Sequence, residues 1–332
     1  MPDGPAKEIS YDTKWIRIES GQIRNTVCTN LNFLVQCVEL YPIKSTKLGE
    51  EIPAVSVWNL VDIRTQSNFE LAINMETDIS NSDFYTDLNS YQFIRRKSYN
   101  KIPLQANVYP MPSGAYIQDN KLRLTALSAQ TLGVCSLVKS QLEIFLDRRL
   151  QQDDNRGLEQ PVLDNKITSS RFVLALEKSK NVNEHIVQPN LAIQMKLFDL
   201  QHPLTVILPT VDDDSLAKLP TSLSLVESNL QLPCGIRILN VRTMQTDDEK
   251  ASNSIGLILH RLGYNCEAIS SDCDLNSKFN LKDLFSFTSI SEVKKTFLTF
   301  QSNAESNEAI SDSKSLVELV SPMEIQAFRL FF

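Results

Sequence analysis

The chain has 332 residues, of which 42% are hydrophobic and 22% charged, and its formal net charge is -7. This composition excludes a disordered chain, and the length allows one large or two ordinary domains. The acidic balance also argues against nucleic acid as a partner, because phosphate backbones are bound by basic surfaces.

Alternation of apolar and polar residues is the main pattern along the chain. LNFLVQCVELY predicts an early strand with these residues on one face: Leu31, Phe33, Val35 and Cys37. NFELAINMETDI alternates in the same way, as do KLRLTAL, QLEIFL, RFVLALE and GIRILNVR. Turn-prone stretches such as SNSDFYTD, YPMPSGAY and TVDDDS separate these segments.

Helical periodicity is weak, and the two short helix candidates are residues 251–262 and 289–296. Strands that follow strands without intervening helices predict antiparallel sheets stacked as a sandwich. We therefore predict an all-β fold, with a large antiparallel β-sandwich over residues 1–200 and a smaller C-terminal β subdomain over residues 201–332. The boundary is placed at QHPLTVILPTVDDD, which holds two prolines and an acidic run.

Motifs for catalysis and metal binding are missing from the sequence. The three histidines and six cysteines are scattered without a CxxC pair, whereas zinc needs three or four clustered ligands. G-x-S-x-G, P-loop and GxGxxG motifs are absent too. We predict no catalytic residue, metal ligand or cofactor in this chain. The sequence leaves open whether Cys266 and Cys273 form a disulfide or remain two thiols.

Targeting and membrane segments are also absent from the sequence as written. No apolar run approaches the roughly 18 residues that a membrane span needs. The N-terminus MPDGPAKE lacks the basic start and apolar core of a signal peptide. We expect neither a membrane segment nor a targeting signal in this chain.

The densest polar segment is LDRRLQQDDNRGLEQ, residues 146–160, directly behind the strand predicted from QLEIFL. If that strand alternates as far as Arg149, then Leu146 and Arg148 lie on its core face, and Arg148 is at the rim. Guanidinium, carboxylate and carboxamide groups give and accept directional hydrogen bonds, which suits the hydroxyls of a sugar. A solvated loop is the alternative interpretation of the segment.

Three runs resemble the C-terminal half of the Golgi class II alpha-mannosidases of glycoside hydrolase family thirty-eight: FYTDLNSYQFIRR, KIPLQANVYPMPSGAYIQDNKLRLTALSAQTLGV and LDRRLQQDDNRGLEQPVLDNKIT. NLVDIR, LPCGIRILNVRTMQ, LILHRLGYNC and SPMEIQAFRL extend the resemblance over nearly the whole chain. Members of the family are retaining, zinc-dependent hydrolases that remove alpha-linked mannose from N-glycans. The resemblance implies that the zinc ion and the nucleophile belong to an N-terminal α/β barrel outside this chain, which alone is expected to be inactive.

The resemblance also implies a role for residues 147–150, which help to close the mannose pocket of the family, partly through a main-chain carbonyl. The substrate-binding residues implied here are Arg148, Arg149, Asp153, Asp154 and Asn155. The implied partners are a mannose-containing glycan and the catalytic barrel, and the implied location is the Golgi lumen. The alternative is a truncated, non-catalytic β module that binds glycans or packs against a partner.

Overall fold

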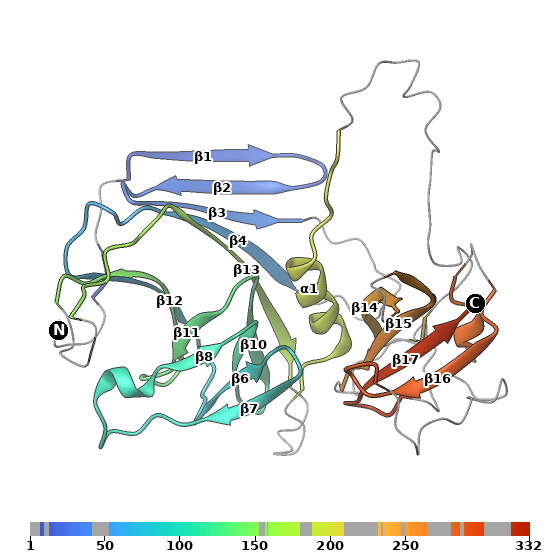
Figure 1. Ribbon diagram of the computed structural model, residues 1–332. Coiled ribbons are helices and arrows are strands. Elements are labelled where there is room, and N and C mark those ends of the chain that lie inside the picture. Colours follow the sequence, from blue (N-terminus) through green and yellow to red (C-terminus); the bar gives the residue numbers. More distant parts are fainter. Residues whose placement is uncertain are drawn as a thin grey trace. The chain divides into compact units, whose positions relative to one another are not determined.

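The computed structural model describes residues 7–9, 13–41, 53–152, 157, 159–179, 188–208, 232–233, 235–246, 250–263, 280–285, 289–301 and 320–332. The chain divides into two compact units (Figure 1). The first consists of Met1–Pro203 with Asn265–Ala268, and the second of Leu204–Tyr264 with Ile269–Phe332. No helix among the described residues is long and apolar enough to cross a membrane.

The described strands of the first unit form two antiparallel sheets. The nine-stranded sheet has the order β1 (Trp15–Ser20), β2 (Asn25–Asn30), β3 (Leu34–Leu40), β4 (Ala54–Val61), β13 (Thr168–Lys178), β10 (Leu122–Ser128), β9 (Gly114–Gln118), β6 (Phe84–Leu88) and β7 (Gln92–Arg96). The four-stranded sheet has the order β5 (Phe69–Glu76), β12 (Gln141–Arg149), β11 (Leu132–Cys135) and β8 (Tyr109–Met111). A 3-10 turn, η1 (Leu104–Asn107), precedes β8.

The core of this unit lies between the two sheets. The nine-stranded sheet contributes Val61, Phe84, Ile117, Ala126 and Phe172, and the four-stranded sheet contributes Leu71, Met111, Val134, Leu142 and Ile144. Each of these side chains is at most 3% exposed. Because alternate residues of each strand point to this interface, the period-two pattern of the sequence is explained, and the predicted all-β fold is confirmed.

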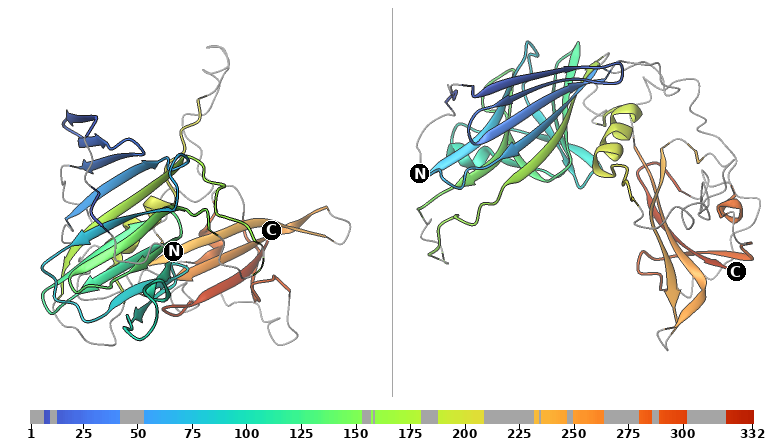
Figure 2. Two further views of the ribbon diagram at one scale, coloured as in Figure 1. Left: turned by 90° about the vertical axis from the view of Figure 1, so that its left-hand side faces the viewer. Right: turned by 90° about the horizontal axis from the view of Figure 1, so that it is seen from above.

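The described strands of the second unit form an antiparallel sheet (Figure 2). Its order is β14 (Ile236–Gln245), β15 (Ala251–Arg261), β17 (Ile325–Phe331) and β16 (Glu292–Thr296), with a 3-10 turn, η3 (Leu281–Asp283). Both segments predicted as short helices are therefore strands, β15 and β16. Because β15 pairs with strands on both sides, its apolar run is that of a central strand rather than of a helix face.

One α-helix, α1 (Leu191–Gln201), was not predicted. Asn190 caps it, because its Oδ1 accepts a hydrogen bond from the Ile193 amide at 2.9 Å. Ile193 and Leu197 are buried against Leu127 and Ala175 of the nine-stranded sheet, on β10 and β13. The cap is visible in the sequence, but the helix is short and its burial depends on tertiary contacts.

The predicted face of strand β3 is wrong for Val35 and Cys37, whereas Leu31 and Phe33 do pack against the core. Asn32 has a left-handed φ of 70°, and the strand begins only at Leu34. Leu34 and Val38 pack against the core between the sheets, while Cys37 lies on the opposite face. A turn of this kind resets the alternation, so an apolar pattern read through it assigns the wrong side.

Candidate functional site

A β-bulge lies near the end of β12 and decides where its two arginines point. Phe145 pairs with Ala72 of β5, but the next residue in register with β5 is Asp147, opposite Leu71. Leu146 is therefore an extra residue in β12, and the alternation of faces changes after it.

The bulge reverses the predicted positions of the arginines. Arg149 is opposite Phe69, which packs against the core, whereas Arg148 is opposite Glu70. Directly opposite residues in antiparallel strands share a face, so Arg149 lies on the core side and Arg148 on the outer side. The prediction that Arg148 lies at the rim of the core face is wrong.

Arg149 ties three segments together. Its Nε donates to the carbonyl of Gln66 at 3.0 Å. Its Nη1 donates to the carbonyl of Leu163 at 2.8 Å and to Oδ1 of Asn165 at 3.2 Å. The fixed fork of a guanidinium suits such a junction. The side chain is half-buried and occupied by these contacts, which makes it an anchor of the surrounding backbone.

Asn165 completes the junction from the other side. Its Nδ2 donates to the main-chain carbonyl of Arg148 at 2.8 Å and to Oδ1 of Asp147 at 3.0 Å. The same Oδ1 of Asp147 accepts from the Arg148 amide at 2.8 Å. The other oxygen, Oδ2 of Asp147, is buried and has no hydrogen-bond partner among the described residues.

The base of the polar segment is closed by backbone contacts. Leu150 and Val162 form an isolated antiparallel bridge, with N–O distances of 3.2 and 2.9 Å. The Gln151 amide donates to Oδ1 of Asn68 at 2.9 Å. These contacts fix the chain on both sides of the predicted loop. The other three predicted site residues, Asp153, Asp154 and Asn155, lie outside the described residues.

Arg148 presents its guanidinium on the outer face of β12. The side chain is exposed, and within the described part of the chain it forms no hydrogen bond or ion pair. Burial raises the pKa of the neighbouring Glu70, and the positive charge of Arg148 opposes that shift. Burial also raises the pKa of Glu143 on the same face, and the charge of Glu70 adds to the rise. The outer face thus carries two carboxyl groups with raised pKa values beside an exposed cation.

Two other sequence features serve the fold. The Tyr85 ring stacks on Tyr116 at 4.5 Å. Asp87 is fully buried and accepts four hydrogen bonds, from the Ser90, Ser113 and Gly114 amides and from the Ser113 hydroxyl. Tyr85 and Asp87 of the FYTD run are therefore both bound within their own sheet.

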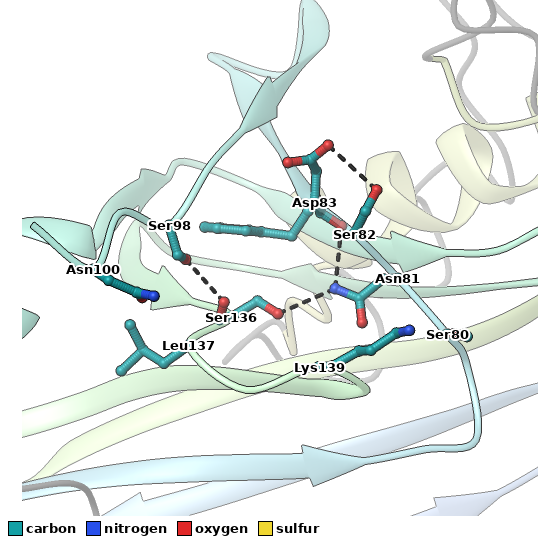
Figure 3. Close-up of a pocket in the computed structure, with 10 residues that line it drawn as sticks. Ser80, Asn81, Ser82, Asp83, Ser98, Asn100, Ser136, Leu137 and Lys139 are labelled. Atoms are coloured by element: carbon teal, nitrogen blue, oxygen red, sulfur yellow. Dashed lines mark hydrogen bonds between the residues drawn. The ribbon is translucent and has the colours of Figure 1, made fainter.

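A polar hollow of about 380 Å³ lies where β12 begins, at the end remote from Arg149 (Figure 3). Its lining consists of Ser80, Asn81, Ser82, Asp83, Phe84, Ser98, Asn100, Ser136, Leu137 and Lys139. Asn81 accepts from the Ser140 amide at 2.7 Å and donates to the Ser136 hydroxyl at 3.3 Å. The Ser98 hydroxyl donates to the Ser136 carbonyl at 2.9 Å. These groups join the loops to one another, so the hollow is a loop junction.

The residues at the β12 end are suited to binding a ligand rather than to catalysing a reaction. Arginine and carboxamide donors bind hydroxyl or carboxylate oxygens, but the described residues supply no paired carboxylates at a shared cleft. No group of three or more His, Cys, Asp or Glu side chains among them is arranged to hold a metal ion. The resemblance assigns the zinc ion to a barrel outside this chain, and the described residues supply no ligand set for it.

Comparison with known proteins places the chain in a family. Residues 1–156 match the model of the glycosyl hydrolases family 38 C-terminal domain. Alpha-mannosidase 2 of Homo sapiens is 38% identical to the chain over 343 residues, which cover 99% of this chain. The chain belongs to glycosyl hydrolase family 38. The alignment covers only 29% of the human protein, so this family 38 chain spans less than a third of that relative.

Other matches agree with this assignment. Alpha-mannosidase 2 of Drosophila melanogaster is 42% identical over 182 residues, which cover 54% of this chain and 16% of that protein. The solved structure of an alpha-mannosidase from Enterococcus faecalis V583 matches with a TM-score of 0.56 and 11% identity, over 95% of this chain and 34% of that one. At this identity the structural match supports the fold.

Sequence reasoning missed the residues that organise the β12 end, above all Asn165 and Gln66. Gln66 lies 83 residues before Arg149 and Asn165 lies 16 residues after it, and the fold brings both to this side chain. The one local signal is the pair Asp147 and Arg149, whose polar side chains interrupt the apolar alternation where the bulge lies.

Proposed function

We propose that this chain is the C-terminal β region of an alpha-mannosidase and forms one wall of its mannose pocket. The observation that carries the proposal is that the two arginines of β12 have different roles. Arg149 and Asn165 hold the backbone in place, while the guanidinium of Arg148 stays exposed. Arg149 therefore stabilises the strand end, and Arg148 is left to bind a ligand.

The chemistry of the wall suits a polyol. Arg148 offers guanidinium donors to sugar hydroxyls, and the strand end offers backbone groups at a fixed position. Asp153, Asp154 and Asn155 follow the anchored residues and would add acceptors and donors for the same ligand. Because Asn165 already binds the carbonyl of Arg148 and the Val162 amide binds that of Leu150, the carbonyls after Leu150 are the better candidates for a substrate contact.

The proposed parent reaction is hydrolysis of alpha-linked mannose in N-glycans, with net retention of configuration. The zinc ion and the nucleophile would belong to a catalytic barrel, because the relatives are more than three times as long as the matched region. We propose the Golgi lumen as the compartment. The disulfide between Cys28 and Cys37 supports this, since such bonds persist in oxidising compartments.

A second candidate function is a non-catalytic β module that binds glycans or packs against a partner. The observation in its favour is that the guanidinium of Arg148 is exposed, which leaves it open to a glycan without any second domain. Under this alternative the chain would bind mannose oligosaccharides or pack against a partner, and it would not form part of an active site.

Complementation separates the two functions. Human alpha-mannosidase 2 lacking the region matched by this chain is co-expressed with the chain, and with an empty vector as control. Retaining hydrolysis of an aryl alpha-mannoside, followed by NMR of the first anomer formed, is expected only with the chain present. A soluble complex of the two proteins without turnover would contradict the pocket-wall function. Direct titration of the chain alone with mannose oligosaccharides tests the alternative.

A further inference from the structure

A row of apolar side chains crosses the nine-stranded sheet on its core-facing side. The row consists of directly opposite residues on neighbouring strands: Phe172, Val57, Val38, Val27 and Ile18. Their exposed fractions rise from 2% at Phe172 and 9% at Val57 to 43% at Val27 and 73% at Ile18. The row therefore begins in the core and ends in solvent.

The cause is the unequal width of the two sheets. The hairpin β1–β2 lies at the end of the nine-stranded sheet, away from β12, β11 and β8 of its four-stranded counterpart (Figure 1). Ile16, on the same face of β1, is 62% exposed. The hairpin thus carries an apolar face that no described residue covers.

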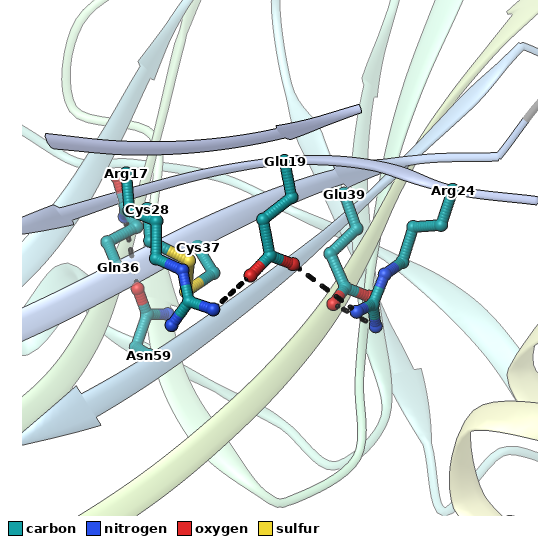
Figure 4. The surroundings of a disulfide bond; sticks show 8 residues. All are labelled: Arg17, Glu19, Arg24, Cys28, Gln36, Cys37, Glu39 and Asn59. Carbon is teal, nitrogen blue, oxygen red and sulfur yellow. Dashed lines mark hydrogen bonds and ion pairs between the residues drawn. A yellow bond between two sulfur atoms is a disulfide. The ribbon is translucent and has the colours of Figure 1, made fainter. Parts of the chain in front are cut away.

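The opposite face of the hairpin is held in place (Figure 4). Cys28 of β2 and Cys37 of β3 are directly opposite and joined by a disulfide. Arg17 forms an ion pair with Glu19 within β1. Arg24, in the β1–β2 turn, pairs with Glu39 of β3 at 3.0 Å. The exposed apolar residues therefore belong to a hairpin fastened to the rest of the sheet.

The disulfide also shows which backbone groups of β1 are free. Its Cα–Cα distance of 4.0 Å is that of a pair without mutual hydrogen bonds, so the backbone of Cys28 points to β1. Arg17, opposite Cys28, then points back to β2. Ile16, Ile18 and Ser20 direct their amides and carbonyls to the outer edge, where no described strand pairs with them. Such an edge is a template for a further strand.

We propose that β1 pairs antiparallel with β1 of a second copy of this chain, around a two-fold axis through Ile18. Because side-by-side antiparallel pairing keeps both core-facing sides on one face, Ile18 then lies beside its counterpart and continues the apolar row into the second copy. Ile16 is opposite Ser20. Arg17 is opposite Glu19 of the other copy, and Glu19 is opposite Arg17.

Charge selects this register. A shift of two residues in one direction places Arg17 opposite Arg17, and the same shift in the other direction places Glu19 opposite Glu19. Like charges directly opposite are destabilising. In the register centred on Ile18, by contrast, each Arg17 lies opposite a Glu19 of the other copy. β1 also lacks proline, glycine and bulges, which commonly block such pairing.

The other edge of the sheet does not share these properties. β7 ends with Arg95 and Arg96, and Lys97 follows directly. Arg95 is paired with Asp83, and the remaining cations, Arg96 and Lys97, oppose pairing of β7 with itself. The β1 contact is small, below the roughly 1,200 Å² of total area typical of stable complexes. A weak dimer that depends on protein concentration is therefore expected.

Sedimentation velocity of the full 332-residue chain over a range of concentrations tests the proposal. The unaltered protein is expected to form a dimer. Arg17→Glu and Glu19→Arg should each raise the dimer Kd at least about tenfold, because each makes the four charges alike. An equimolar mixture of the two variants should recover the dimer, since opposite signs then face each other. A chain that stays monomeric at every concentration would overturn the proposal.

Ile18→Pro provides a second test. Proline removes an amide that points away from β2, so the hairpin is expected to keep its fold while the dimer is lost. Circular dichroism and an intact disulfide by mass spectrometry check the fold. A dimer that persists in Ile18→Pro, or that ignores both charge variants, would show that the copies meet elsewhere and would also overturn the proposal.

Discussion

The carboxamide of Asn165 binds the guanidinium of Arg149 through its oxygen and the main-chain carbonyl of Arg148 through its nitrogen. One side chain thus fixes two consecutive residues at the end of β12. Its position separates their roles, because it occupies the side chain of Arg149 but only the backbone of Arg148. Arg148 remains available to a ligand, and Arg149 does not.

The first prediction concerns the stability of this junction. Arg149→Ala removes three hydrogen bonds from a half-buried cation and leaves two main-chain carbonyls without their donor. We expect the free energy of unfolding to fall by about 2 kcal/mol or more. Arg148→Ala is the matched control and should change it little, because that guanidinium is exposed. Urea unfolding of both variants checks this, and equal losses would contradict the assigned roles.

The second prediction concerns Asp87, whose buried carboxylate accepts four hydrogen bonds. Asp87→Asn replaces one acceptor oxygen by a donor and leaves buried amides unmatched. We expect a loss of about 3 kcal/mol, measured by denaturant unfolding. Asp62→Asn is the control, since Asp62 forms an exposed ion pair with Arg64, and its loss should be much smaller. Comparable effects of the two changes would refute the role of Asp87.

The third prediction concerns pH. Burial, and secondly the charge of Glu70, raise the pKa of Glu143 above its ordinary 4.5. The folded state therefore holds this proton more tightly than the unfolded state does. The resulting stabilisation is present below the unfolded pKa and is lost as pH rises through the folded pKa.

Glu143→Gln removes that dependence. Relative to the unaltered protein, the melting temperature of this variant should increase as pH rises from about 4.5 to about 7. Scanning calorimetry at several pH values measures the difference. A difference that stays constant across this range would show that Glu143 does not titrate as its surroundings require.

The sequence predicted the all-β class because alternation survives in the strands that border the core. It did not predict the orientation of Arg148, because a single extra residue, Leu146, changes every face after it. It also did not pair Cys28 with Cys37, since their adjacency depends on the register of β2 and β3. Residues such as Asn165 reach the site through long-range packing, which leaves no local pattern.

The fourth prediction concerns the disulfide. Cys28 and Cys37 are separated by nine positions, so their bond closes a short loop. Replacing both by alanine should lower the free energy of unfolding by about 2 kcal/mol. Cys135→Ala is the control that leaves the bond intact. Peptide mapping without reductant should recover Cys28 and Cys37 in one linked species, and two separate free thiols would contradict the structure.

Arg148 gives the most direct test of the pocket-wall function, in a chimera. This chain replaces the matching region of human alpha-mannosidase 2, and kcat/KM for a mannose-containing substrate is compared between the chimera and its Arg148→Ala variant. We predict that kcat/KM falls at least about tenfold while the melting temperature is unchanged, because under the proposed function Arg148 contacts the ligand and does not support the fold. Unchanged kcat/KM in a folded variant would contradict the account and leave the β12 end as scaffold.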